Sequence, residues 1–417
     1  MNTPKIFSYK NKDNIASEVL DAFQKVSPSR IEVESDFSLD NYTKKIFNLF
    51  YKVLKFPPQL INNKKVLDFG CGTGEVDLVL ANWGADVEGF DFNPDSIERA
   101  KSLASEISSS NNGKLSFSIG DVHNFKFSPS SYDIVISMGV IAHVKDQRLM
   151  FKRMIEACKP GGFIILGYID SFGLIQRLLH RSIIKTCSES NEMDEKNIHK
   201  MAISLFGEHI ERSVQRGGRT AASVINDYLV NPHYLGIDLN EMIKWVNEEN
   251  VDLYSYWPNL EYPFTINSPY KDNNPTKFKI FKSWSSFLKL RWMYTLQEDE
   301  DVFDSISEKL PTLDKETEKL IVHLNEVLQN EDISKENIDN IKSTLADIEL
   351  KVNNSMEVFH DHISSYTEDL NKELTGVLDL ILKASQNEQL VDLHPVTKRL
   401  FKGYNGLGTN YMVLCKE

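Results

Sequence analysis

The chain has 417 residues and a mass of 47.8 kDa, and its 26% charged and 41% hydrophobic residues are typical of a globular protein. With only 20 Gly and 14 Pro, collagen-like and low-complexity classes are excluded. The sequence contains no long apolar run and its start, MNTPKIFSYKNKDN, has no apolar segment, so we expect neither a membrane span nor a signal peptide. The four cysteines form no CxxC pair and no metal-ligand spacing, which predicts a reduced, cytoplasmic protein without disulfides or a metal site.

The net charge of −13 is concentrated in one part of the chain. Residues 298–417 contain 25 acidic and 12 basic residues, whereas residues 1–297 contain 35 of each. An acidic surface repels a phosphate backbone, but an electrically neutral one does not. The acidic excess of the last 120 residues therefore disfavours nucleic acid as a partner, whereas the charge of the first 297 residues does not.

Helix and strand patterns alternate over the first 170 residues. Helical spacing covers residues 37–55 and ends before Pro57-Pro58. Further helices are predicted at 94–108 and 145–158, and a Lys-Pro-Gly-Gly turn follows at 159–162. The predicted strands are residues 65–69, 85–91, 115–119, 134–137 and 163–166. This alternation predicts an α/β fold with a mostly parallel, doubly wound sheet.

After residue 170 the pattern changes. Residues 171–237 mix helix and loop, and residues 238–250 form a predicted helix that runs into a strand at 251–257. Residues 314–384 are strongly helical: from Ile338 to Ile381 the apolar positions cover 43 residues in 12 steps, a mean of about 3.58. This period fits a straight helix packed on a globular body, with a break at 353–355. Residues 409–415 read as an edge-type strand.

A glycine-rich loop follows the first predicted strand, in VLDFGCGTGEVDL. Glycines allow a ligand to approach the backbone closely, and the following helix offers unpaired N–H groups. A dinucleotide-binding loop would read G-x-G-x-x-G, but Glu75 takes the last position and the third glycine, Gly74, comes one residue early. Glu75 would also face a pyrophosphate with like charge. The loop therefore favours a ligand whose near portion is zwitterionic.

Two carboxylates follow the next two strands. Asp91 lies 19 residues beyond Gly72, where a carboxylate can accept both hydroxyl protons of a ribose. Asp121, after the next strand, can accept from an exocyclic amine such as that of adenine. The glycine loop thus predicts a zwitterionic ligand group, and the two carboxylates predict a nucleoside without phosphates. S-adenosylmethionine (SAM) combines these two parts.

These segments resemble the class I SAM-dependent methyltransferase family. The motifs LDFGCGTGEVDL, GFDFNP, SIGDVHNFKFSPSSYDIVISMGVIAHVKD and CKPGGFIIL occur in the family's order. DLNEMIKWVNEENVDLYSYWP resembles the family's last helix and sixth strand, and TNYMVLCKE resembles its seventh, antiparallel strand. The resemblance implies a seven-stranded Rossmann-like sheet with SAM as cofactor.

The resemblance assigns cofactor-binding roles to matching positions. It places the methionine end of SAM beside Asp68, Gly70, Cys71 and Gly72, the ribose and adenine beside Asp91, Phe92, Asp121 and Val122, and the sulfonium beside Met138. One departure is Ala142, where many relatives have His or Glu, so that His143 alone remains in that stretch.

It also implies a division of the chain into six segments. These are an N-terminal helical segment covering the cofactor site (1–60), the SAM-binding core (61–170), a lid or substrate insert (171–237), the last core helix and strand (238–258), a mostly helical acidic insertion (259–405) and the final core strand (406–417).

The acceptor side is predicted from position alone. His143, Tyr168 and His233 are the candidate catalytic residues, and Asp170, Arg219, Asp227 and Tyr228 the candidate substrate ligands. Tyr168 and Asp170 end the fifth strand, where such sheets bind substrate groups. His143 has two interpretations, a general base or a structural ring, and the insert has two as well, a substrate lid or a solvated cap.

Three functions are compatible with this sequence. The first is methyl transfer to an O or N atom of a small or medium-sized metabolite. The second is RNA or tRNA methylation, for which the basic residues between Lys271 and Arg291 are the candidate track. The third is a SAM-binding regulatory protein without turnover, whose acidic helical region recruits a protein partner or a second copy of the chain.

Overall fold

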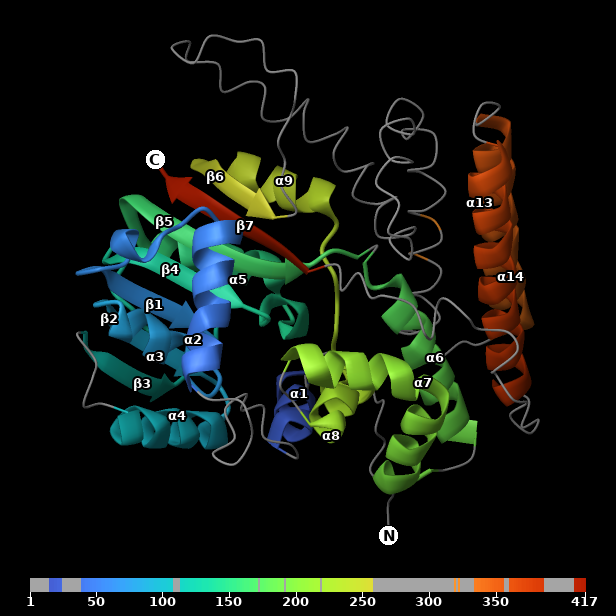
Figure 1. Cartoon of the computed structure of the whole chain (residues 1–417), viewed down its shortest axis with the longest axis horizontal. Coiled ribbons are helices and arrows are strands. Elements are labelled where there is room, and N and C mark those ends of the chain that lie inside the picture. The colour runs from blue at the N-terminus through green and yellow to red at the C-terminus, as the bar shows by residue number, and fades with distance from the viewer. Residues whose placement is uncertain are drawn as a thin grey trace.

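The fold is built around one seven-stranded sheet. The computed structural model describes residues 15–24, 39–107, 113–171, 173–190, 193–217, 220–257, 319, 322, 334–355, 360–385 and 409–417. The strand order is β3-β2-β1-β4-β5-β7-β6, as Figure 1 shows. The strands are β1 (Lys65–Phe69), β2 (Asp86–Asp91), β3 (Leu115–Ile119), β4 (Tyr132–Met138), β5 (Cys158–Ile169), β6 (Val251–Trp257) and β7 (Thr409–Lys416). Strands β1 to β5 are parallel, which confirms the predicted doubly wound α/β sheet.

Strand β7 lies inside the sheet, which confirms the seventh, antiparallel strand implied by the family resemblance, whereas the prediction of an edge-type strand was wrong. It pairs antiparallel with β5 on one side and with β6 on the other. Met412, Val413 and Leu414 are all buried, since helices cover both faces of the sheet there. A continuous apolar run is typical of such a strand, whereas an edge strand usually alternates or carries charges.

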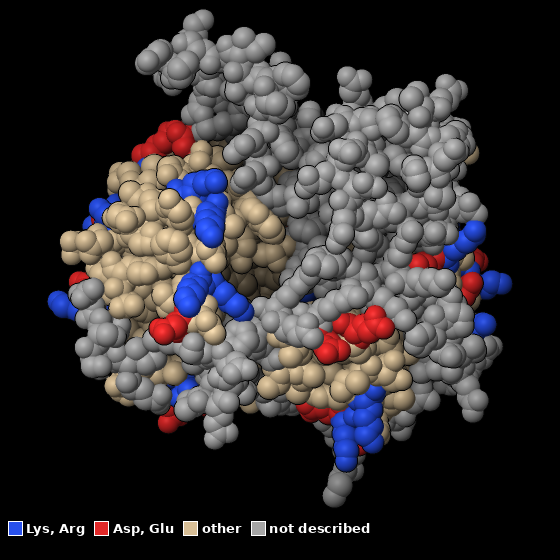
Figure 2. All heavy atoms as spheres, viewed as in Figure 1, with Lys and Arg blue, Asp and Glu red and all other residues tan. Residues whose placement is uncertain are grey.

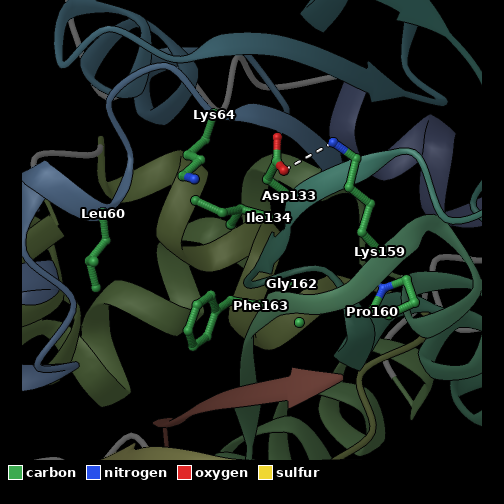
Figure 3. Close-up of a pocket in the computed structure, with 9 residues that line it drawn as sticks. Leu60, Lys64, Asp133, Ile134, Lys159, Pro160, Gly162 and Phe163 are labelled. Atoms are coloured by element: carbon green, nitrogen blue, oxygen red, sulfur yellow. Dashed lines mark hydrogen bonds and ion pairs between the residues drawn. The ribbon is translucent and has the colours of Figure 1, made fainter. Parts of the chain in front are cut away.

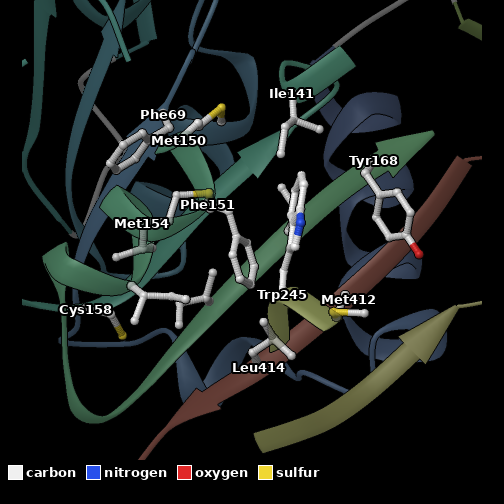
Figure 4. Close-up of a cluster of buried hydrophobic side chains, with 14 of the residues drawn as sticks. Phe69, Ile141, Met150, Phe151, Met154, Cys158, Tyr168, Trp245, Met412 and Leu414 are labelled. Carbon is white, nitrogen blue, oxygen red and sulfur yellow. The ribbon is translucent and has the colours of Figure 1, made fainter. Parts of the chain in front are cut away.

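Successive residues of the strands point to opposite faces of the sheet. On one face, Val66, Ile136 and Val413 pack against helix α2 (Leu39–Phe47), the π-helical turn after it (Asn48–Val53) and α3 (Glu75–Asn82). On the other face, Leu67, Leu166 and Leu414 pack against α5 (Gln147–Ala157) and α9 (Leu239–Glu248), as the close-up in Figure 4 illustrates. Helix α4 (Pro94–Ile107) covers β3 through Ile97 and Ala100. Strands β1, β4, β5 and β7 thus each contribute to two separate cores.

A further core, formed by helices, lies beside the sheet. It joins α6 (Ile175–Ser190), α7 (Glu195–Gly217), α8 (Ala221–Ile225) and the turn Asn226–Val230 to α13 (Lys335–Ser355) and α14 (His360–Ser385). Helix α13 ends at Ser355, at the predicted break, and packs against α14, with an ion pair between Lys342 and Asp379. Helix α14 packs in turn on α6, so the helices that precede β7 cover the segment that follows β5 (Figure 1).

The remaining described helices are short. Helix α1 (Ile15–Gln24) contacts the turn Asn226–Val230, and two 3₁₀ turns occur at Pro58–Leu60 and Ile141–His143. Within the described part of the chain, no helix combines the length and the apolarity needed to cross a bilayer.

The interior position of β7 makes its side chains important for stability. We expect Leu414→Ala to lower the free energy of unfolding by about 2–5 kcal/mol, because the lost methyl groups leave a cavity under α5 and α9. Thr409→Ala, at the half-buried start of the same strand, is the matched control. Urea unfolding measures both, and a Leu414→Ala protein as stable as the control would contradict the burial described above.

Candidate cofactor and acceptor site

The glycine loop is held in an unusual backbone conformation at the carboxyl end of β1. Gly70, Gly72 and Gly74 have φ values of 77°, 55° and 76°, a region that favours glycine. The N–H groups of Gly70 and Cys71 both donate to the Phe90 carbonyl at the end of β2, at 2.8 and 3.0 Å. A side chain at Gly72, or at Gly139 after the neighbouring β4, would meet no atom within 4 Å. Open space therefore adjoins the ends of β1 and β4, where the strand order reverses and such sheets bind ligands.

Asp91 fastens this loop to β2. Its Oδ2 accepts the Gly72 N–H at 2.9 Å, and its Oδ1 accepts the Asn93 N–H at 2.9 Å. Burial raises the pKa of Asp91 above its ordinary value, although these backbone donors act in the opposite direction. Each carboxylate oxygen has a second lone pair, so Asp91 can still accept hydroxyl protons.

Two further carboxyl groups are buried under the loop. Asp68 ends β1 and Asp77 lies in the first turn of α3; Asp68 Oδ1 and both Asp77 oxygens are enclosed without a well-formed hydrogen bond. Burial raises the pKa of Asp68 to about 7 and that of Asp77 well above its usual range, and the charge of Asp68 raises the latter further. Burial and the same carboxylates raise the pKa of Cys71 well above that of an ordinary thiol, which argues against a nucleophilic role. The two buried carboxyl groups interact with each other and form no ion pair with a cation of the described residues, which suits a cationic ligand group.

Asp121 follows β3 and is held by a histidine that sequence reasoning missed. Its Oδ1 accepts from the His123 backbone N–H at 2.8 Å and contacts the His123 Nδ1 at 2.6 Å. These contacts lower the pKa of Asp121. The spacing Asp-x-His after a strand was the available signal for this pair. The predicted cofactor residues that follow these strands, Phe92, Val122 and Met138, lie at the same edge of the sheet.

On the other side of this edge, His143 meets residues of the 171–237 segment. Its Nε2 is 3.3 Å from Asp227 Oδ1, within ion-pair distance but not aligned for a hydrogen bond. Its Nδ1 lies 3.1 Å from the His233 carbonyl oxygen and 3.2 Å from Asn231 Nδ2. The Tyr234 ring packs on it, with centroids 4.9 Å apart. The fold thus brings together three residues predicted from sequence, His143, Asp227 and His233.

His233 itself is buried and neutral. Its Nε2 lies 3.2 Å from the Val144 carbonyl and must donate to it, and burial lowers the pKa of the ring to about 4. This arrangement suits a residue that fixes the loop against His143 rather than one that exchanges protons near neutral pH. The predicted catalytic role of His233 is therefore better replaced by a positioning role.

Tyr168 is not positioned for catalysis, in contrast to the prediction. The side chain is 1% exposed in the core of β5, β6 and β7 (Figure 4), and its hydroxyl lies 2.7 Å from that of Tyr256. Burial raises the pKa of Tyr168 well above the usual value. The physical reason is that β7 and β6 continue the sheet beyond β5, so that the Tyr168 side chain is buried against them and is not exposed at the end of its strand. Asp170, just beyond, is also buried.

Of the other predicted acceptor residues, Tyr228 is half-buried and lies under the guanidinium of Arg177. Arg219 lies outside the described residues. Asn231 and Arg177 were missed, because their roles depend on how the turn Asn226–Val230 folds back on α6.

A separate cavity of about 170 Å³ opens at the opposite edge of the sheet. Figure 3 shows its lining by Lys64, Phe163 and the Asp133–Lys159 ion pair, at the amino ends of β4 and β5. It lies away from the glycine loop and is no part of the candidate site. Among the described residues, no cluster of His, Cys, Asp and Glu is suited to hold a metal ion.

Comparison with known proteins identifies the domain. Residues 60–243 match the family model described as a methyltransferase domain. The mitochondrial ubiquinone biosynthesis O-methyltransferase of Schizosaccharomyces pombe is 37% identical over 118 residues, which are 28% of this chain and 42% of that protein. The norajmaline N-methyltransferase of Rauvolfia serpentina is 29% identical over 139 residues, 33% of this chain and 43% of that protein. The chain thus matches less than half the length of each of these two relatives.

Among solved structures, the magnesium protoporphyrin IX methyltransferase of Synechocystis PCC 6803 with bound SAH has 19% identity and a TM-score of 0.29, and the match covers 38% of this chain and 70% of that one. The family match and the four motifs agree on the class. Residues 60–243 match a methyltransferase domain, in agreement with the resemblance to the class I SAM-dependent family. SAM is the cofactor of that family.

The raised pKa of Asp68 leads to a prediction with opposite effects on stability and binding. A carboxyl whose pKa is raised in the folded state destabilises that state as the pH rises from about 4 to about 7. We expect Asp68→Asn, which cannot ionise, to increase the free energy of unfolding at pH 8 by about 1–3 kcal/mol while weakening SAM binding about tenfold or more. Urea unfolding at pH 5 and pH 8 and calorimetry with SAM measure the two effects. Asp95→Asn, exposed on α4, is the control, and a loss of stability at pH 8 in Asp68→Asn would refute the assignment.

The lowered pKa of His233 leads to a second pH prediction. Below the unfolded-state value of 6.5 the unfolded chain binds a proton that the folded one does not, so this residue destabilises the fold as the pH falls from 6.5 towards 4. His233→Gln retains a donor near Val144 and cannot titrate. The free energy of unfolding should therefore fall in both proteins over this interval, and the fall in His233→Gln should be smaller than that in the wild type by about 2–3 kcal/mol. Parallel unfolding curves at pH 6.5 and 4.5 test this, and identical pH dependence in both proteins would contradict it.

Proposed function

We propose that this protein is a SAM-dependent methyltransferase that acts on an O or N atom of a small or medium-sized metabolite. The observation that carries the proposal is the open space beside Gly72 and Gly139, with the buried carboxyl groups of Asp68 and Asp77 on one side and the His143–Asp227 pair near the other. The named activities of the relatives, on ubiquinone precursors and an alkaloid, support a small acceptor.

The residues around this space suit the parts of SAM. The Asp68 carboxyl would hold the cationic ammonium, and the backbone of the Gly70–Gly72 loop would line the methionine portion. Asp91 would accept the ribose hydroxyls beside Phe92, and Asp121 with Val122 would contact the adenine. Met138 would lie beside the sulfonium. SAM supplies a methyl group already activated by the positive charge on sulfur.

The chain's own contribution is to align the acceptor and take its proton. The methyl carbon bonds to the acceptor atom as its bond to sulfur breaks, and the electron pair stays with sulfur, so positioning supplies most of the rate. The proton of a hydroxyl or amine acceptor must go to a base. With the Nδ1–H of His143 donating to the His233 carbonyl, its Nε2 lone pair can take that proton, and the nearby Asp227 carboxylate stabilises the imidazolium.

Asn231 and the His233 carbonyl together accommodate both neutral tautomers of the same ring without movement. When Nδ1 is bare it can accept from Asn231 Nδ2, and when it is protonated it can donate to the His233 carbonyl. Asn231 is itself oriented by the His233 N–H, which donates to its Oδ1 at 3.0 Å. The loop 231–233 is therefore suited to support a general base.

The remaining predictions concern surroundings and partners. All four cysteines are free, which supports a reducing compartment such as the cytoplasm. The predicted basic track between Lys271 and Arg291 lies outside the described residues, and on the face shown in Figure 2 basic and acidic side chains of the described residues are interspersed. Nothing in the described residues therefore favours a nucleic-acid acceptor, and a partner of the acidic helices stays a prediction.

The proposed cofactor site can be tested by binding. We expect Asp91→Ala to weaken SAM binding by about 1.5–3 kcal/mol, roughly 10- to 150-fold, because the ribose loses its acceptor and the Gly72 N–H loses its anchor. Calorimetry on the wild type, Asp91→Ala and the exposed control Asp95→Ala measures this. Unchanged affinity in a folded Asp91→Ala protein would remove the ribose assignment, and binding of NAD without SAM would overturn the proposal.

A further inference from the structure

Helix α6 carries a row of cations that is buried in the helical core. Arg177, Arg181 and Lys185 are four residues apart, and each is at most 3% exposed. The other faces of this helix pack against α7 and α14 through leucines and isoleucines. Burial of a cation is costly unless partners compensate for its lost hydration. The partners of Arg177 are therefore decisive.

The guanidinium of Arg177 is only partly satisfied. Its Nη1 donates to the Tyr234 hydroxyl at 2.7 Å, and its plane lies over the Tyr228 ring, 3.6 Å from the centroid. Its Nε and Nη2 are enclosed and make no hydrogen bond. No carboxylate of the described residues forms an ion pair with Arg177. A buried donor without an acceptor destabilises the fold by about 1–3 kcal/mol.

The two unsatisfied nitrogens lie on the same edge of the guanidinium. Nε–H and one Nη2–H point in the same direction, and this pair of parallel donors matches the two coplanar oxygens of a carboxylate. The fold has already removed water from these donors, so a carboxylate would form charge-assisted bonds in surroundings of low dielectric constant. A single neutral oxygen would leave one donor unpaired.

Arg177 is also close to the proposed site of proton transfer. Tyr234, which accepts from Arg177, packs its ring against His143. Tyr228, which lies under the guanidinium, follows Asp227 directly in the same turn. Arg181 donates to the Asn231 carbonyl at 2.7 Å and so holds the loop that contacts His143. The Tyr234 side chain therefore contacts both the Arg177 guanidinium, through Nη1, and the ring of His143.

We propose that Arg177 determines acceptor specificity by binding a carboxylate group of the methyl acceptor through Nε and Nη2. The proposal rests on the proposed function, and it narrows the substrate class to metabolites that carry both a carboxylate and the methylated O or N atom. The aromatic rings of Tyr228 and Tyr234 beside the guanidinium favour an acceptor with a flat, apolar body next to its carboxylate.

The test uses small probes on the full-length protein with and without SAH. Binding of benzoate, of its neutral isostere benzamide and of phenyl phosphate is measured by calorimetry. We expect the wild type to bind benzoate at least tenfold more tightly than benzamide, and Arg177→Gln to lose this preference. Arg177→Lys keeps the charge but lacks the paired donors, and should lose most of the preference as well. Arg148→Lys, on α5 and paired with Glu248 and Glu249, is the control and should keep it.

The outcomes separate this inference from the proposed function. Equal binding of benzoate and benzamide by the folded wild type would overturn the carboxylate site, and this comparison needs no variant. Phenyl phosphate binding more than tenfold tighter than benzoate would overturn the choice of carboxylate. SAM affinity is measured in the same samples and should not change in Arg177→Lys. If SAM did not bind but benzoate did, the proposed function would fail while the anion site remained.

Discussion

The candidate site depends on three backbone hydrogen bonds between the glycine loop and the end of β2. The Gly70 and Cys71 N–H groups share the Phe90 carbonyl, and the Gly72 N–H binds the Asp91 carboxylate. These bonds hold three positive-φ glycines in a conformation that other residues adopt only at a cost. The same carboxylate is the proposed acceptor for the ribose. Loop shape and ligand recognition therefore share one side chain, and neither can change without the other.

The two halves of the site are complementary in charge. Under the loop, Asp68 and Asp77 are buried acids whose pKa values are raised by burial and by the charges of neighbouring carboxylates. In the helical segment, Arg177 is a buried cation whose Nε and Nη2 have no hydrogen-bond acceptor. Groups of this kind reduce stability in the ligand-free protein, and functional sites commonly contain them. A cationic cofactor would supply a partner for the buried carboxyl groups, and an anionic methyl acceptor would supply one for Arg177.

The positions of the proposed cofactor residues could be predicted from the sequence because their signals are local. Gly70, Gly72, Asp91 and Asp121 each follow a strand within a few residues, and the strand order brings those ends together. The acceptor half depends on contacts between segments far apart in the chain. Tyr168 was misassigned because β6 and β7 bury it, and Arg177 was missed because a cation every fourth residue is usual on an exposed helix face. Only the packing of the turn Asn226–Val230 and the residues after it on α6 shows that this face is buried.

The position of β7 has a consequence for how the chain folds during synthesis. Residues 258–408 separate β6 from β7, so at roughly 5–20 residues per second a ribosome needs about 8–30 s between these strands. Throughout that interval β5 has an open edge and β6 has no neighbour in the sheet. Unpaired strand edges promote aggregation. Cellular yield of this protein should therefore respond to translation rate and to chaperones that shield nascent chains, more than its final stability would suggest.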